Sequence, residues 1–143
     1  MAPDAFFGLE DPQGRLYFFL EADRGTMTVP RFTRKIAAYA TYLREGRHRD
    51  KFGIKSFWVL TVTTGRRRRE HLISAARDVD AVRSLEYHFL FTDEECISLE
   101  HPESFLGKIW TTPGDARPHR LLGPQSSSTT RKEDQTYGQP DRR

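Results

Sequence analysis

Residues 56–64, SFWVLTVTT, form the strongest strand pattern in the sequence. The stretch is rich in β-branched and aromatic residues, which favour strands, and it is mostly apolar on both faces. A strand of this kind is typical of the centre of a sheet whose faces are covered by other elements. Gly65 ends the pattern. The stretch therefore predicts the central strand of a helix-covered sheet.

One helix is predicted before this strand in the sequence and another after it. The first spans residues 28–43 and carries one apolar stripe with spacings of three and four. Thr28 is placed to cap it, Pro30 lies in its first turn, and Gly46 ends it. The second helix spans residues 66–79. The apolar stripe of the first helix consists of Val29, Phe32, Ile36, Tyr39, Ala40 and Leu43, and the second turns Leu72, Ile73 and Ala76 inward.

Three further strands are predicted. Residues 4–10 and 16–23 flank the turn signal DPQG at 11–14 and form a hairpin with a four-residue loop. Residues 86–92, EYHFLFT, form the fourth strand. The resulting order, ββαβαβ, predicts an α/β fold with a mixed sheet of about four strands, because strand–helix–strand connections favour parallel pairing and right-handed crossovers.

The rest of the chain is less regular. Residues 93–107 contain at most a short helix, and residues 108–110 form a short strand or a docking segment. The 143 residues suggest one domain, predicted over residues 1–122, followed by a disordered polar tail over residues 123–143.

A cytoplasmic protein is indicated by several absences. Cys96 is the single cysteine, so no disulfide can form within the chain, and it is interpreted as structural. The first residues lack the pattern of a signal peptide, and no apolar run is long enough to span a membrane.

Positive charge is clustered on either side of the central strand, within a formal net charge of +3. Clusters of this kind favour an anionic partner such as nucleic acid, although each can also be an ordinary solvated surface. Arginines at the start of the second helix oppose its dipole, which suggests phosphate contact or tolerated surface charge. The clusters consist of Arg44, Arg47, His48, Arg49 and Lys51, and of Arg66, Arg67, Arg68 and Arg69.

Three acids are predicted to meet at one end of the hairpin. Glu21 and Asp23 share a face of their strand because they are two residues apart. If Glu10 pairs with Arg15, then Asp4 lies opposite Glu21 on the same face. Three carboxylates repel one another unless a cation lies between them, and Mg²⁺ prefers such ligands.

The helix after the hairpin adds a cation to this group. Lys35 lies at the edge of the apolar stripe and can lean back toward the acids, where it could stabilise a phosphoryl transition state or position a water. The alternative is purely structural. In it Asp4 is a surface residue, and Glu21 and Asp23 form salt bridges with Arg24, Arg31 or Lys35.

These motifs resemble two known patterns. Pro3-Asp4, Glu21-x-Asp23 and Lys35 resemble a PD-(D/E)xK nuclease-like core, with Asp23 where that motif has lysine and Lys35 moved to the helix. Over residues 2–112, the stretches PDAFFGLE, LYFFLEADRGT and RKIAAYATYL are similar to the replication-relaxation family of plasmid and mobile-element proteins. Relative to that family, the chain lacks a winged-helix-like N-terminal region and the first helix and strand of the core. It therefore reads as an N-terminally truncated form or a C-terminal module.

The resemblance implies a restriction-endonuclease-like fold and a DNA-related role. It implies a Mg²⁺-dependent nuclease-like protein or, alternatively, a non-catalytic DNA- or protein-binding module in plasmid replication or transfer. The implied partners are DNA and replication or mobilisation proteins. The implied residues are Asp4, Glu21 and Asp23 for metal and catalysis, Lys35 for catalysis, Tyr39 packing beneath Lys35, and Arg24, Arg66, Arg67, Arg68 and Arg69 for nucleic acid.

Overall fold

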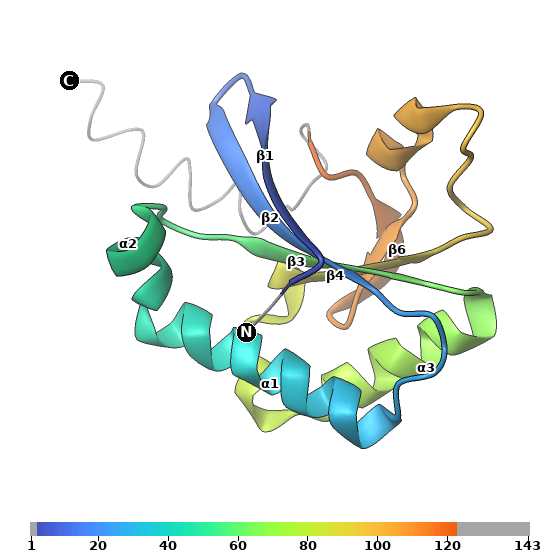
Figure 1. Cartoon of the computed structure of the whole chain (residues 1–143), viewed down its shortest axis with the longest axis horizontal. Coiled ribbons are helices and arrows are strands. Elements are labelled where there is room, and N and C mark those ends of the chain that lie inside the picture. The colour runs from blue at the N-terminus through green and yellow to red at the C-terminus, as the bar shows by residue number, and fades with distance from the viewer. Residues whose placement is uncertain (1–2, 123–143) are drawn as a thin grey trace.

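Residues 3–122 of the chain are described by a computed structural model, in which helices cover one face of a six-stranded sheet (Figure 1). The predicted tail at residues 123–143 lies outside the described residues. The strands are β1 (Ala5–Asp11), β2 (Gly14–Ala22), β3 (Trp58–Thr63), β4 (Phe89–Asp93), β5 (Trp110–Thr112) and β6 (Asp115–His119). The helices are α1 (Val29–Glu45), α2 (Arg47–Phe52) and α3 (Arg66–Arg77), with 3-10 turns η1 (Asp80–Val82), η2 (Glu86–His88) and η3 (Pro102–Leu106).

The strands lie in the sheet in the same order as in the chain. Strands β2, β3 and β4 are parallel, whereas β1 and the β5–β6 pair are antiparallel to their neighbours. The predicted mixed α/β sheet with order ββαβαβ is therefore confirmed through β4. The predicted count of about four strands is too low, because β5 and β6 extend the sheet. The three residues of β5 are too few to show an alternating pattern, so its pairing with β4 becomes visible only in the folded chain.

The hairpin has the predicted register with a shorter turn. Glu10 faces Arg15 and Ala5 faces Leu20, as expected. The strands continue to Asp11 and from Gly14, so two residues form the turn in place of the predicted four. The Asp11 carboxylate accepts a hydrogen bond from the Gln13 amide at 2.9 Å and stabilises this tighter turn.

Helices α1 and α3 lie on the same face of the sheet (Figure 1). Right-handed crossovers that advance in one direction, from β2 to β3 to β4, place both helices on one side. Alternation along the strands then separates two apolar clusters, with Phe19 and Val59 toward the helices and Phe18 and Leu60 on the opposite face. Trp110 and Leu121 complete the second cluster, so the central strand is buried on both faces as predicted.

The ends of the elements follow local signals with a few shifts. The Thr28 hydroxyl accepts from the Arg31 amide at 3.3 Å, and Gly46 ends α1 in the left-handed conformation with φ of 75°. The predicted strand at residues 86–92 begins only at Phe89, because residues 86–88 form turn η2. The second predicted helix ends at Arg77, and α2 was not predicted. Among the described residues, no helix has the length and apolar character needed to cross a membrane.

Candidate functional site at the carboxyl edge of the parallel strands

Polar side chains gather where β2, β3 and β4 end. These strands are parallel, so their carboxyl ends meet at one edge of the sheet, and α1 and α3 begin at the same edge. In open α/β sheets this edge is the usual location of ligand sites. The buried polar residues at this edge are Glu21, Asp23, Thr61, Thr63, Thr92 and Asp93.

Glu21 is buried, with 6 % of its surface exposed, and both of its carboxylate oxygens have partners. Lys35 Nζ lies 2.6 Å from Oε1, and the Tyr39 hydroxyl donates a hydrogen bond to Oε2. Lys35 and Tyr39 are four residues apart on α1 and therefore point to the same side. Burial, and then the hydrogen bond and charge of Glu21, raise the pKa of Tyr39, so Tyr39 is a neutral donor at physiological pH.

Asp4 joins this group from the neighbouring strand. Its amide donates to the Leu20 carbonyl at 3.0 Å, one residue out of the β1–β2 register, which ends at the Ala5–Leu20 pair, and this bond places Asp4 beside the end of β2. The Asp4 carboxylate accepts from the Ala22 amide at 2.8 Å and remains exposed. Its charge also contributes to the raised pKa of Tyr39, although less than burial and Glu21 do. The fold thus brings Asp4, Glu21, Lys35 and Tyr39 together, as the sequence suggested.

Asp23 belongs to a different group of contacts. Its Oδ2 accepts from the Thr63 hydroxyl at 2.5 Å and from Arg68 Nε at 2.9 Å, and its Oδ1 accepts from Arg68 Nη2 at 3.1 Å. Burial alone would raise the pKa of Asp23, but the hydrogen bonds from Arg68 and Thr63 and the Arg68 charge hold it below the ordinary value. Asp23 is therefore the ionised partner of Arg68.

This separation bears on the predicted magnesium site. Within residues 3–122, no group of three His, Cys, Asp or Glu residues could hold a metal ion. Asp23 is occupied by Arg68, and Glu21 is occupied by Lys35 and Tyr39. The three carboxylates therefore do not fit a shared Mg²⁺ as they are arranged here. Dependence on Mg²⁺ stays a prediction.

A second buried acid–arginine pair lies at the end of β4. Asp93, with 1 % of its surface exposed, has its Oδ2 3.4 Å from Arg69 Nη1 and accepts from the Glu95 amide at 2.9 Å. Cys96 lies beside this pair, with its sulfur 4.0 Å from Arg69 Nη1. Sequence reasoning did not select Asp93. The available signal was its position, because Asp93 ends an apolar strand in the same way that Asp23 follows β2.

The run of four arginines therefore divides into two pairs. Arg68 and Arg69 turn inward to buried carboxylates, whereas Arg66 and Arg67 are exposed. Arg66 forms an exposed ion pair with Glu70 at 3.1 Å, one turn further along α3. The side chain of Arg67 has neither a hydrogen bond nor an ion pair with any residue in the described part of the chain. Two of the five predicted nucleic-acid contacts, Arg68 and Arg69, are thus also structural.

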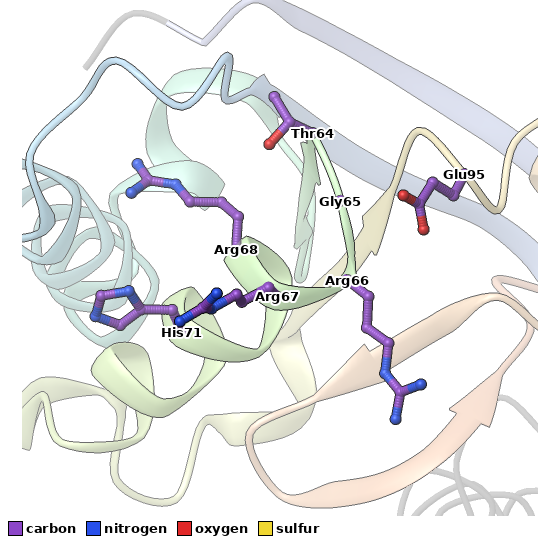
Figure 2. Close-up of a pocket in the computed structure, with 7 residues that line it drawn as sticks. All are labelled: Thr64, Gly65, Arg66, Arg67, Arg68, His71 and Glu95. Carbon is purple, nitrogen blue, oxygen red and sulfur yellow. The ribbon is translucent and has the colours of Figure 1, made fainter.

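An open pocket of about 510 Å³ lies at the start of α3 (Figure 2). Gly65 has no side chain to cap the helix, so amide groups of the first turn are left without a capping acceptor. In Figure 2, Arg68 reaches toward the loop after β2, while Arg67 and His71 lie together below it. The pocket is lined by Thr64, Gly65, Arg66, Arg67, Arg68, His71 and Glu95.

The Asp23–Arg68 pair predicts a specific response to acid. The pKa of Asp23 lies below the ordinary value of 3.8 in the folded chain. The ionised carboxylate therefore stabilises the folded state fully at pH values above 3.8, and this contribution is lost as the pH falls through the folded pKa. We expect the difference in unfolding free energy between the parent and Asp23→Asn to shrink as the pH falls below about 4. Urea titrations between neutral and acid pH measure it, and a difference independent of pH would contradict it.

The arrangement defines an α/β domain in which the buried acids at one edge of the sheet, Glu21, Asp23 and Asp93, are ion-paired, and the same edge carries a basic pocket. Comparison with known families then identifies part of the chain. A family model described as replication-relaxation matches residues 1–56, which cover β1, β2, α1 and α2. The matched part contains Asp4, Glu21, Asp23, Lys35 and Tyr39.

The predicted family resemblance is confirmed over this part of the chain. The resemblance was predicted to extend to residue 112, and the model match ends at residue 56. No curated protein and no solved structure matches the chain. The basic pocket at α3 lies beyond the matched residues, so its role is argued from its own geometry.

Proposed function

We propose that this chain is a non-catalytic DNA-binding module in the replication or mobilisation of a plasmid or other mobile element. It would contact the phosphate backbone with the pocket at the start of α3. The replication-relaxation match supports the general setting. The observation that carries the DNA-binding role is the division of charge at this edge. The three buried acids Glu21, Asp23 and Asp93 each have a cationic partner of their own, while Arg66 and Arg67 remain exposed.

This division leaves an edge that favours anions. A helix start carries partial positive charge and free amide donors, which suit a phosphate oxygen. Arginine side chains add charge and several donors in a planar arrangement that matches phosphate. Contacts of this type hold a protein on DNA without reading its sequence. The pocket therefore supports backbone binding, and the proposal makes no claim about a preferred sequence.

Arg24 can extend the same surface. It is exposed in the loop after β2, next to Gly25, whose φ is 83°. A side-chain carbon added at Gly25 would lie 3.7 Å from Thr64, so this loop runs beside the wall of the pocket. The predicted contacts of Arg24, Arg66 and Arg67 thus come from the loop after β2 and from the start of α3, at one edge of the sheet.

Binding to a labelled DNA duplex at several salt concentrations tests the proposal. With three or four phosphate contacts, the logarithm of the association constant should fall with the logarithm of salt concentration with a slope of about −3. Fluorescence anisotropy between about 50 and 200 mM salt measures this slope. A folded protein that shows no binding, or binding without salt dependence, would rule out a role in contacting the phosphate backbone.

A metal-dependent nuclease is the second candidate. The observation that favours it is the position of the exposed Asp4 at the end of β2, next to the group that Glu21 forms with Lys35. Asp4 and Glu21 would be the metal ligands in this reading, and Lys35 would stabilise charge on the phosphate. Asp23 would have to leave Arg68 in order to join them.

Titration with Mg²⁺ or Mn²⁺ by calorimetry separates the two candidates. For a non-catalytic module we expect no saturable heat and no DNA cleavage that EDTA abolishes. Asp4→Asn is the matched variant, because it removes an exposed carboxylate but keeps an oxygen for the Ala22 amide. Saturable binding in the parent that is lost in Asp4→Asn would favour the nuclease, and Glu21→Ala/Asp23→Ala would then extend the test to the buried acids.

A further inference from the structure

Arg68 differs from the other three arginines because it lines the pocket and is also held by a buried acid. It donates from Nε and Nη2 to the two oxygens of Asp23, at 2.9 and 3.1 Å, and from Nη2 to the Met27 carbonyl at 2.7 Å. Its Nη1 has no hydrogen-bond acceptor among residues 3–122. A guanidinium has five N–H donors, so two remain on Nη1. The side chain is 20 % exposed, and Nη1 is not one of the buried side-chain atoms that lack a partner, so these donors reach solvent.

The acid that holds Arg68 is itself fixed by the sheet. The Asp23 amide donates to the Val62 carbonyl of β3 at 2.8 Å, and the Thr63 hydroxyl donates to the carboxylate at 2.5 Å. Asp23 is almost fully buried, with 4 % of its surface exposed. The two hydrogen bonds of the Arg68 guanidinium therefore go to a carboxylate that the central strand β3 holds in place. The orientation of the guanidinium is restricted before any ligand arrives.

We propose that Asp23 is a positioning residue, which holds Arg68 so that its free Nη1 donors bind a phosphate oxyanion at the start of α3. The proposal rests on the proposed DNA-binding function and assigns a role to Asp23 other than metal ligand. A preoriented guanidinium loses less side-chain entropy on binding than a freely rotating one, so its contact with phosphate is stronger. Arg66 and Arg67 would supply positive charge, and Arg68 would supply N–H donors with a fixed orientation.

The chain provides a matched control at the neighbouring strand. Asp93 and Arg69 form a second buried acid–arginine pair at the same edge. Arg69 does not line the pocket, and only Arg68 of the two is held in a bidentate manner. Asp23→Asn and Asp93→Asn therefore disturb comparable buried pairs, but only the first should affect phosphate binding.

The experiment titrates inorganic phosphate into the folded protein and follows the Nε–H signal of Arg68 by NMR. We expect a saturable shift in the parent and in Asp93→Asn, with affinity for phosphate reduced about tenfold in Asp23→Asn, because the Arg68 side chain must then be ordered on binding. Arg68→Lys keeps the charge but cannot form the two-point contact with Asp23. It should therefore reduce the affinity for DNA as much as Asp23→Asn does. It is also the second variant if Asp23→Asn fails to fold.

A second experiment uses DNA in place of inorganic phosphate. It shows whether Arg68 contacts a backbone or a terminal phosphate, and it separates failure of this proposal from failure of DNA binding. Duplexes with a 5′-phosphate or a 5′-hydroxyl should bind equally if Arg68 contacts backbone phosphates, and the first should bind more tightly if it contacts a terminal phosphate. If neither phosphate nor DNA affects the Arg68 signal while the parent binds DNA with the expected salt slope, the positioning role is wrong and the binding function stands. Equal losses in the Asp23 and Asp93 variants would also overturn it.

Discussion

Replacing Arg66 and Arg67 together with glutamate is expected to weaken DNA binding by roughly 100-fold at about 0.1 M salt, because two phosphate contacts and their released counterions are lost. The slope of log affinity against log salt should fall by about 2 in magnitude. The fold should tolerate the change. Both side chains are exposed, and acids in the first turn interact favourably with the helix dipole. Repulsion from Glu70, the present partner of Arg66, offsets part of that gain.

A matched variant tests whether position or only charge matters. Arg47 and Arg49 are exposed on α2, which precedes β3 and lies at the opposite end of that strand (Figure 1). Arg47→Glu/Arg49→Glu changes the net charge by the same amount and should leave most of the affinity. If it weakens binding as much as the α3 variant does, the pocket has no special role and the contact is a general effect of net charge.

Replacing Glu21 with alanine is expected to lower the free energy of unfolding by about 3 kcal/mol, as removal of one member of a buried ion pair usually does. Lys35 loses its carboxylate partner, and the buried Tyr39 hydroxyl loses its acceptor. For a domain of this size the melting temperature should fall by roughly 10 °C. Chemical denaturation and thermal melting measure the two quantities.

The exposed Glu10–Arg15 pair of the same hairpin is the control. Glu10→Ala should produce no measurable change, because solvent screens a pair of this kind. A Glu21→Ala protein as stable as the parent would contradict the structural role of Glu21. It would instead be the behaviour expected of an acid kept for chemistry, and it would strengthen the nuclease candidate.

The predictions for Arg66 and Arg67 and for Glu21 concern two groups of charges at the same edge of the sheet, one exposed and one buried. The ion pairs neutralise the buried acids at the carboxyl edge, and the exposed Arg66 and Arg67, together with Glu95, then determine the charge that a ligand meets in the pocket. The opposition between arginines and the α3 dipole, already visible in the sequence, is partly relieved in the fold because Arg68 and Arg69 bind carboxylates. Arg66 and Arg67 keep the unfavourable position, which a bound phosphate would relieve.

Local patterns determined much of the architecture. The apolar stretch at residues 56–64 predicted the central strand because burial on both faces requires apolar residues at every position. The stripe and end signals of α1 predicted its extent, and the turn at Pro12–Gln13 set a register that brings Asp4 close to the end of β2. Lys35 was expected near the acids because it lies at the edge of the apolar stripe of the helix that follows them, and its ammonium group lies 2.6 Å from the Glu21 carboxylate.

Only the tertiary structure decided the partners of the remaining charges. Asp23 and Arg68 are 45 positions apart, and their contact depends on how α3 packs on the sheet beside α1. The same packing pairs Asp93 with Arg69 and leaves Arg67 exposed, although the four arginines are consecutive and chemically identical. By itself the sequence determined which residues are charged and which strands are buried. The packing of α3 on the sheet decided which charges are neutralised. The side chains of consecutive helical residues point in different directions, and only the packed helix shows which of them face the buried acids.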